Sequence, residues 1–378
     1  MRIDILDSIS AIEPAEWNRL AGDAWPFLRH EFLEAAETTG CVSPATGWQP
    51  RHVVVRPSRG GKAVAVMPLY EKTHSWGEFV FDWSWAQAYH RAGLEYYPKL
   101  VSAVPFTPAP SPRLLAGGDP DQARILLDAA LELAREGGHS SLHVLFPDER
   151  ELPGLRAAGL KLRKDCQFHW HNRGYATFDE FLATFSSAKR KKARRDRRRV
   201  EEQGIRLRRL FGRDTDAALW RDVYALISTT FLERASMPYL DYDFFVSLSS
   251  RLPDNVLVVL AERHRSPVAA AVFYVGGDTL YGRYWGSDGY YDALHFETCY
   301  YQGIEYCIEK GLARFEPGTQ GEHKVARGFT PVATWSAHWL ARPEFFSAVG
   351  RYLAEERRHV DRYMAAVDRH SPYRSAPE

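Results

Sequence analysis

The sequence predicts an α/β fold in which mixed sheets are flanked by helices and one arrangement of elements occurs twice. Helical patterns alternate with short apolar strand patterns along the chain, and this alternation is typical of sheets layered with helices. A length of 378 residues is long for one hydrophobic core and suggests two domains of ordinary size. Because both halves show a similar order of elements, a duplicated unit is favoured.

The first half begins with helix patterns and continues with strand patterns. In residues 25–40, the side chains of Leu28, Phe32 and Ala35 fall on one side of a helix that Gly40 ends. Short runs rich in valine and aromatic residues follow and indicate strands. In chain order, the expected elements are helices 14–22 and 25–40, strands 51–57, 62–72 and 78–85, helix 121–138 and strand 141–147.

The second half repeats this order. Residues 255–287 predict three strands in a meander, because turn sequences interrupt an otherwise apolar segment twice. A helix over 293–311, ended by Gly311, and a strand over 313–318 follow. A long amphipathic helix over 343–370 closes the chain, and it either docks on the protein or pairs with a second copy.

A strongly basic segment lies between the two halves. Lys189 to Arg199 includes nine basic residues and one acid, although the net charge of the whole chain is only +1. The residues are strong helix formers, so we expect a helix that Ser186 or Ser187 caps and Gly204 ends. Three interpretations are open: a nucleic-acid contact, a phosphate clamp for a bound donor, or a solvated helix face.

Several classes of protein are excluded by what the sequence lacks. It contains neither a signal-peptide pattern nor an apolar run near the roughly 20 residues of a membrane helix. The four cysteines are scattered without a C-x-x-C pair, which argues against a disulfide framework and a zinc site and favours a cytoplasmic protein. No hydrolase elbow, zinc-protease pair, Walker loop or Rossmann fingerprint is present. The near-neutral charge argues against DNA binding.

Two segments carry a resemblance to a known superfamily. "SSAKRKKARRDRRRVEEQG" and, about a hundred residues later, "EYCIEKGLARFEPGTQGEHKVARGF" are similar to the Fem-like branch of the GNAT acyltransferase superfamily. The chain as a whole resembles a bacterial family described as peptidoglycan biosynthesis or recognition proteins. Three blocks carry this resemblance. They are "PFLRHEFLEAAETTGCVSPATGWQPRHVVVR", "FVFDWSWAQAYHRAGLEYYPKLVSAVPFTP" and "LHFETCYYQGIEYCIEKGLARFEPGTQGEHKVARGF", and together they span residues 26–329.

The resemblance implies two GNAT-like domains in tandem. We expect the first over 1–165 and the second over 166–378, the latter including the basic linker 186–204 and the final helix. It also implies transfer of an acyl or aminoacyl group to an amine. The glycine turn with which ordinary acetyltransferases hold the coenzyme A pyrophosphate is absent before residue 293. The donor is therefore either a coenzyme A thioester or an aminoacyl-tRNA, the donor of the Fem transferases.

Acyl transfer needs a proton acceptor for the amine, stabilisation of the oxyanion and a donor held in line. Polar side chains gather after the strand 313–318, and sites in α/β proteins are usually built beyond strand ends. Glu316 and Glu297 are the first candidates for the base, and His323 is the next. For substrate binding we expect Arg283, Tyr284, Trp285, His295, Gln320, Lys324 and Arg327 of the second half and Tyr89, Tyr97 and Lys99 of the first.

The basic segment is assigned to the donor. Lys192, Arg194, Arg195 and Arg198 are expected to bind its phosphates. We expect no permanently bound cofactor and no metal. The partners are an amine acceptor, either a small molecule or a peptide, and, as a candidate, tRNA. The alternatives are a nucleic-acid-binding protein and a catalytically silent protein that recognises a cell-wall precursor between its domains. The acceptor, the acyl group and the oligomeric state are not specified by the sequence.

Overall fold

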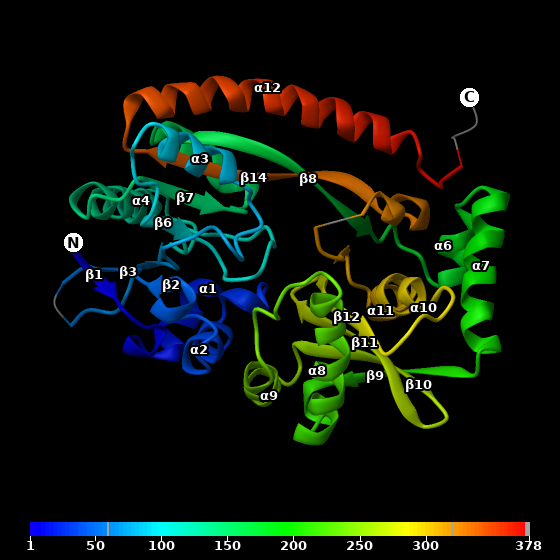
Figure 1. Cartoon of the computed structure of the whole chain (residues 1–378). Coiled ribbons are helices and arrows are strands. Elements are labelled where there is room, and N and C mark those ends of the chain that lie inside the picture. Colours follow the sequence, from blue (N-terminus) through cyan, green and yellow to red (C-terminus); the bar gives the residue numbers. More distant parts are fainter. Residues whose placement is uncertain (59, 320, 375–378) are drawn as a thin grey trace. The chain divides into compact units, whose positions relative to one another are not determined.

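The structure is a computed structural model that describes residues 1–58, 60–319 and 321–374. The chain divides into two compact units (Figure 1). The first comprises Met1–Asp165 and Ala333–Arg362, and the second comprises Cys166–Val332 and Tyr363–Glu378. Residues 333–362, which the sequence-based division placed in the second domain, thus belong to the first unit, because the strand β14 (Thr330–Leu340) pairs with the strand β7 (Ser141–Leu145).

The first unit combines two sheets with six α-helices among the residues described. The order of one sheet is β1-β3-β4, and that of the other is β2-β5-β6-β7-β14. In the second sheet β6 and β7 are parallel and the remaining pairs are antiparallel, so the sheet is mixed. The elements are β1 (Arg2–Leu6), α1 (Pro14–Ala21), α2 (His30–Thr38), β2 (Trp48–Pro50), β3 (His52–Arg56), β4 (Ala65–Met67), β5 (Tyr70–Lys72), α3 (Trp83–Arg91), β6 (Lys99–Ser102), α4 (Pro120–Glu136), β7 (Ser141–Leu145) and α5 (Leu152–Ala157), followed much later by α12 (Pro343–Asp368).

The second unit is built on one mixed sheet with the order β8-β13-β12-β11-β10-β9. Helix α8 packs against β11 and β12, as Figure 1 shows. Two strands, β8 and β14, begin in one unit and end in the other. The elements are β8 (Lys161–His171), α6 (Phe178–Ala183), α7 (Ser187–Glu202), β9 (Ile205–Phe211), α8 (Ala217–Leu232), α9 (Tyr242–Arg251), β10 (Val256–Arg263), β11 (Ser266–Gly276), β12 (Thr279–Ser287), α10 (Leu294–Phe296), the π-helix η6 (Glu297–Tyr301), α11 (Gln302–Lys310), β13 (Arg314–Glu316), the 3-10 helix η7 (Glu322–Arg327) and β14 (Thr330–Leu340).

These units confirm the predicted α/β fold with mixed sheets and flanking helices. The helix over 121–138, the strand over 141–147 and the meander over 255–287 are confirmed by α4, β7 and β10–β12. Each unit has its own apolar core. In the first, α4 covers the sheet through Leu126 and Leu127, whereas Phe315 and Trp170 are fully buried in the second.

Two of the predicted strands are wrong. The segment 62–72 forms two strands in different sheets, β4 and β5, because Pro68 between them cannot donate to a strand ladder. In the segment 78–85, residues 78–82 form a loop and residues 83–85 begin helix α3; Phe79 has a positive φ of 58°, which a strand does not accommodate. This loop directs the carboxylates of Glu78 and Asp82 into the interior.

Candidate active site

The strands β12 and β13 bring together Arg283 and Glu316, two of the predicted site residues. These strands are parallel, and Tyr281 lies opposite Glu316. The register between β11 and β12 shifts at Arg283, so this residue is the extra residue of a β-bulge, a device that redirects side chains. A guanidinium nitrogen of Arg283 donates to Glu316 Oε1 over 2.6 Å. Both side chains are almost fully buried, and burial raises the pKa of Glu316 although Arg283 opposes the shift.

Lys324 is the most unusual side chain of this region. It lies in η7, in the loop after β13, and only 2% of its surface is exposed. Its Nζ donates to the carbonyl oxygen of Gly318 over 2.6 Å. Burial, with the charge of Arg283, lowers the pKa of Lys324 to about 7, against the opposite influence of Glu316. The site therefore holds an amine that changes charge near neutral pH.

His323 precedes this lysine and is more exposed. Its Nε2 and the hydroxyl of Tyr300 are 2.8 Å apart. Tyr300 belongs to the π-helix η6, and π-helical turns are frequent at functional sites. Burial and the charges of Arg327 and Lys324 lower the pKa of His323, so the imidazole is neutral at pH 7. His295 lies close by, with ring centroids 6.1 Å apart, and its pKa is lowered to about 4, chiefly by burial.

Arg327 connects the site to the basic helix. Its guanidinium lies 3.3 Å from the ring centre of Phe296 and donates to the carbonyl oxygen of His323 over 2.7 Å. A second nitrogen is 3.9 Å from Asp196 on α7. The side chain of Arg327 is buried, so its guanidinium group is fixed in this position.

Glu297, predicted as a base, is occupied by structural partners. Its Oε2 accepts from Arg197 over 3.1 Å and its Oε1 from Gln302 over 2.8 Å. Arg197 also forms two hydrogen bonds with the carboxylate of Glu305, at 3.0 and 2.9 Å. These ion pairs attach α7 to the helical segment 297–310. Burial, against the influence of Arg197, raises the pKa of Glu297.

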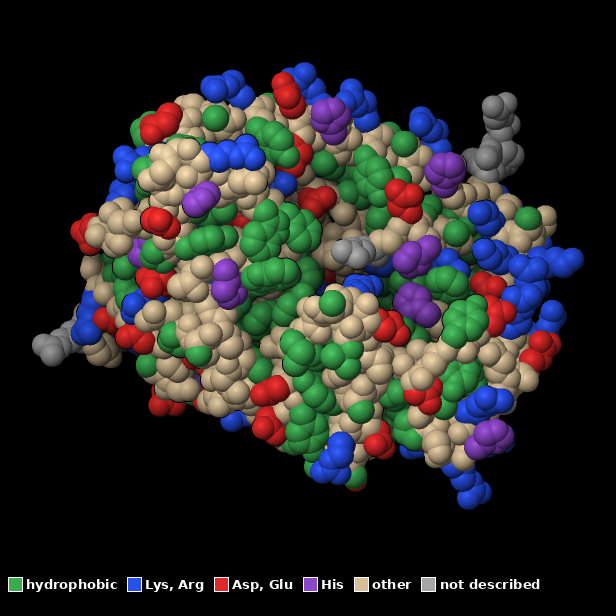
Figure 2. All heavy atoms as spheres, in the orientation of Figure 1, with side chains coloured by type: hydrophobic (Ala, Val, Ile, Leu, Met, Phe, Trp, Pro, Cys, Tyr) green, Lys and Arg blue, Asp and Glu red, His purple; other side chains and the backbone are tan. Residues whose placement is uncertain are grey.

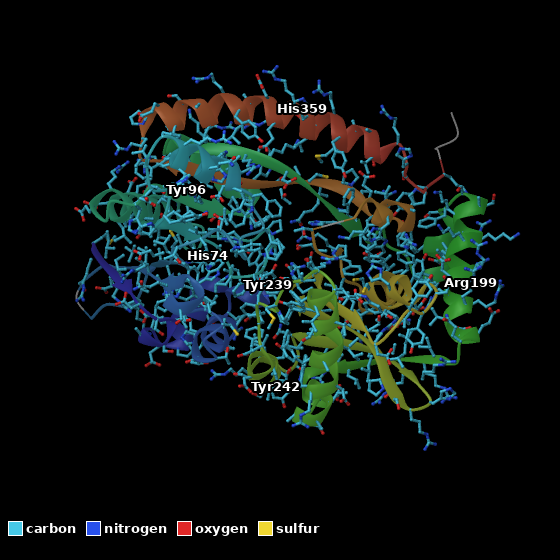
Figure 3. The ribbon with its side chains drawn as sticks, viewed as in Figure 1. His74, Tyr96, Arg199, Tyr239, Tyr242 and His359 are labelled. Carbon is cyan, nitrogen blue, oxygen red and sulfur yellow. The ribbon has the colours of Figure 1, made fainter. Side chains whose placement is uncertain are left out.

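The opposite face of α7 carries the predicted phosphate ligands. Lys192, Arg194, Arg195 and Arg198 are all exposed, and Figure 2 shows Lys and Arg side chains gathered over α7. Arg194 pairs with Asp179 and Arg198 with Glu202, in both cases between exposed side chains. A hollow of about 310 Å3 is lined by Ser187, Arg190, Lys191, Arg194, Arg195 and Arg198. Arg199, which Figure 3 labels on α7, does not line this hollow and pairs with Asp292 instead.

The remaining predicted residues of the second unit lie around these groups or outside the described residues. Trp285 contacts His295, with ring centroids 5.2 Å apart, and Tyr284 contacts Phe245 at 5.3 Å. Gln320 lies outside the described residues. Tyr300 and Gly318 complete the site, and neither was predicted. Two adjacent tyrosines in "ETCYY" were the available signal for Tyr300, whereas Gly318 contributes only its backbone oxygen.

The predicted residues of the first unit surround a buried ionic cluster. Lys99 has no exposed surface, and its Nζ lies 2.8 Å from Glu78 and 2.5 Å from Asp82. Burial would lower the pKa of Lys99, but the two carboxylates raise it. Tyr97 shares a hydrogen bond of 2.8 Å with Ser75. Tyr89 is buried against Phe345, with ring centroids 4.2 Å apart.

The described residues show neither a membrane-spanning helix nor a metal cluster. No helix among them is both long and apolar enough to cross a bilayer. Within the same residues, no three His, Cys, Asp or Glu side chains gather closely enough to hold a metal ion.

Comparison with family models identifies the protein family of this chain. The model of the FemAB-like family, described as peptidoglycan biosynthesis/recognition, matches residues 8–375. The chain belongs to this family. No curated protein matches the sequence.

Solved structures of low sequence identity share the fold. A crystal structure of FemX is 12% identical, with a TM-score of 0.57 over 93% of this chain and 100% of that one. The C-terminal domain of a putative lysylphosphatidylglycerol synthetase from Agrobacterium fabrum is 11% identical, with a TM-score of 0.54 over 92% of this chain and 97% of that one. L-PGS from Bacillus licheniformis is 11% identical, with a TM-score of 0.53 over 93% and 97%. The predicted Fem-like fold is thus confirmed.

Proposed function

We propose that the protein is an N-acyltransferase that moves an acyl or aminoacyl group onto an amine, and that its second unit carries the chemistry. The observation that carries the proposal is the buried amine of Lys324, whose pKa is lowered to about 7. It lies in one loop with the histidine that Tyr300 contacts. Strongly shifted groups that converge in one place are typical of active sites.

The proposed reaction gives His323 and Lys324 different roles. The acceptor amine attacks the donor carbonyl carbon, and neutral His323 accepts the proton that the amine loses. The negative charge that develops on the carbonyl oxygen is stabilised by the protonated Lys324, which Gly318 positions through its carbonyl oxygen. When the tetrahedral intermediate collapses, the bond to the donor's leaving group breaks, the protonated His323 returns its proton to that group, and the new amide remains.

This assignment replaces the two carboxylate bases expected from sequence. Glu316 accepts a hydrogen bond from Arg283 and Glu297 accepts one from Arg197, so each carboxylate is already paired with a guanidinium group. Burial raises the pKa of both groups, so it is their ion pairs with arginine, and not a low basicity, that argue against them as the base. We assign Glu316 and Arg283 the task of holding the strand ends around Lys324. Trp285 and His295 lie beside the same loop and are assigned to the substrate.

The donor is proposed to be a coenzyme A thioester or an aminoacyl-tRNA. Both carry phosphates, and the exposed face of α7 presents arginines, which bind phosphate through two parallel hydrogen bonds. The name of one similar structure, a lysylphosphatidylglycerol synthetase, supports an aminoacyl group as the one transferred. The family's description supports a cell-wall precursor as the source of the acceptor amine.

The donor can be tested by thermal stabilisation of the purified chain. Coenzyme A thioesters, dephospho-coenzyme A and aminoacyl-tRNA are compared, since a ligand at a hundred times its Kd adds about 2.7 kcal/mol to the free energy of unfolding. We expect one donor class to raise the Tm and the triple variant Arg194→Glu, Arg195→Glu, Arg198→Glu to abolish that rise. The matched control replaces Arg351, Arg358 and Arg362 of α12 in the same way. If neither donor class changes the Tm, or the first triple variant responds like the control, the donor assignment fails.

A further inference from the structure

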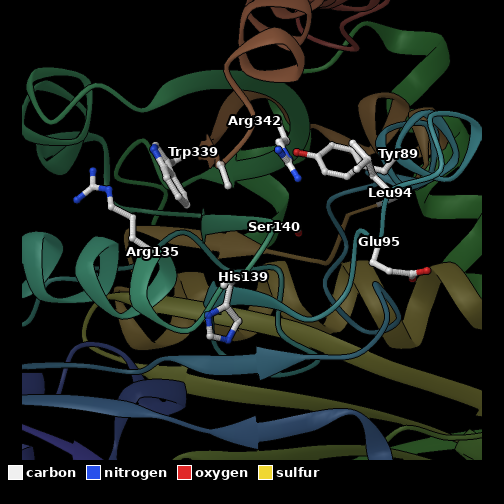
Figure 4. A pocket seen from close by; sticks show the side chains of 10 residues that line it. Tyr89, Leu94, Glu95, Arg135, His139, Ser140, Trp339 and Arg342 are labelled. Carbon is white, nitrogen blue, oxygen red and sulfur yellow. The ribbon is translucent and has the colours of Figure 1, made fainter.

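The first unit contains a cavity that the proposed reaction does not use. Its volume is about 630 Å3, within the range of roughly 300–1,000 Å3 that is typical of small-molecule sites. The cavity lies where β14 ends and β7 begins, beside the end of α4 and the end of α3 (Figure 4). Six of the residues that line it matter here: Tyr89, Arg135, His139, Ser140, Trp339 and Arg342.

Two guanidinium groups line this cavity without an acidic partner. Among the residues that the structure describes, no carboxylate lies within ion-pair distance of Arg135 or Arg342, whereas Arg29, Arg56 and Arg163 of the same unit each pair with one. Figure 4 shows the hydroxyl end of Tyr89 pointing toward Arg342 and the carboxylate of Glu95 pointing away from Arg135 and His139. The lining therefore holds two guanidinium groups that form no ion pair with a described residue, against the single carboxylate of Glu95.

A buried histidine adds an unused polar atom. His139 is 5% exposed, and its Nε2 lies 2.9 Å from the carboxylate of Glu71. Because that nitrogen donates to the carboxylate, Nδ1 is left to face another partner, and it has no hydrogen bond within the described part of the chain. Buried polar atoms are normally paired in folded proteins, so an unpaired one beside a cavity indicates a missing partner.

The floor of the cavity rests on the buried ionic cluster. The hydroxyl of Ser140 donates to the carbonyl oxygen of Tyr96, and the hydroxyl of Tyr96 donates to Asp82 over 2.7 Å. Asp82 in turn pairs with Lys99. A chain of buried hydrogen bonds that ends in an ion pair holds its members in one geometry. The polar floor is thus fixed before a ligand arrives.

We propose that this cavity is a binding site for a small molecule that carries a phosphate group. Arg135 and Arg342 are its anion ligands, because guanidinium groups match phosphate oxygens in pairs. Trp339, over which Arg135 lies at 5.4 Å, and Tyr89 contact the organic part of the ligand. Inorganic phosphate alone fills a small part of 630 Å3, so the ligand is a phosphate ester of larger size. This site is independent of the proposed transfer reaction.

The test is calorimetric titration of the full chain with four probes. Adenosine 5′-diphosphate, glucose 6-phosphate and inorganic pyrophosphate represent phosphates, and citrate represents carboxylates. The double variant Arg135→Gln, Arg342→Gln is compared with Arg351→Gln, Arg358→Gln, which removes the same charge from exposed positions of α12. Both variants keep the basic face of α7, so binding there is the same in each. The Tm of each variant without ligand shows whether it is folded.

We expect at least one phosphate ester to bind the wild-type chain and to lose at least tenfold in affinity in the first variant only. Pyrophosphate is expected to bind more weakly than that ester. Equal affinities in the two double variants would overturn the proposal, as would the absence of binding by every phosphate probe. Binding of citrate together with failure of the phosphates would overturn the phosphate assignment in favour of a carboxylate site. If the first variant does not fold, the single variants Arg135→Gln and Arg342→Gln take its place, and each is expected to lose affinity for the same ester.

Discussion

Lys324 is the residue on which the proposed chemistry depends. Replacing it by methionine removes the cation that stabilises the oxyanion, and loss of one such group typically lowers kcat by about 10²–10³-fold. The Tm should change little, because replacing a buried charge by an apolar side chain of similar size is often neutral. Transfer assays and thermal melts of the same preparation check both expectations. Loss of activity that merely follows loss of folding would contradict them.

The lowered pKa of Lys324 also predicts a pH profile. The ammonium form is the active one and is lost as the pH rises through about 7, so kcat/KM should fall on the alkaline side. On the acidic side the rate should fall as His323 is protonated, below its ordinary pKa of about 6.5. The variant Lys324→Arg keeps its charge at high pH and should lose the alkaline decline. A profile that is unchanged in this variant would exclude Lys324 as the titrating group.

Tyr300 is predicted to position His323 rather than to react. Burial raises the pKa of Tyr300, so its hydroxyl stays protonated. Tyr300→Phe removes the hydrogen bond of 2.8 Å to the imidazole and should lower kcat roughly tenfold, less than the 10²-fold or more expected for loss of the base in His323→Gln. The acidic limb of the pH profile should also move in Tyr300→Phe. An unchanged limb would show that the tyrosine has a packing role only.

At the scale of single residues, chemical character could be predicted from the sequence, but partners could not. The polar loop after β13 was visible as a group of charged residues between glycines. Which carboxylate would be occupied was not, because Arg197 and Glu297 are separated by 100 positions and meet only through folding. Arg283 likewise reaches Glu316 because it lies in a β-bulge, and no clear sequence pattern marks this bulge.

At the scale of elements, α7 is predicted to be a docked helix with an exposed basic face. Glu297→Gln should lower the free energy of unfolding by about 1–3 kcal/mol, because Arg197 loses a charged acceptor. Transfer activity should remain within a few-fold of wild type. Denaturant melts and transfer assays separate these effects. A stable variant without activity would restore Glu297 as a base.

The elements themselves were predictable where their pattern was long and regular. The 17 residues of α4 and the 26 of α12 follow a helical repeat with clear ends. The loop 78–82 was mistaken for a strand because its residues are mainly aromatic and apolar, which is also typical of strands. Its conformation is determined by Lys99, which binds Glu78 and Asp82 from β6.

At the scale of the whole molecule, the chain passes three times from one unit to the other, so the first unit is not a continuous segment. The fragment 1–165 lacks β14, the partner of β7, and the side chains of Leu340, Val349 and Leu353 that pack on Trp85. We expect this fragment not to unfold cooperatively in thermal melts. A fragment in which a short linker joins residue 165 to residue 333 and which ends at 362 should do so. Cooperative melting of 1–165 alone would contradict the division described.

The central claim is that the second unit transfers an acyl group to an amine through Lys324. The most direct measurement is detection by mass spectrometry of an N-acylated product after incubation with donors of both classes and a set of amines, including cell-wall precursor peptides. We predict that wild-type protein forms an amide product with one donor class and that folded Lys324→Met forms at least a hundredfold less, in keeping with the loss of an oxyanion-stabilising group. A product formed equally by the two proteins, or by neither, would contradict the claim.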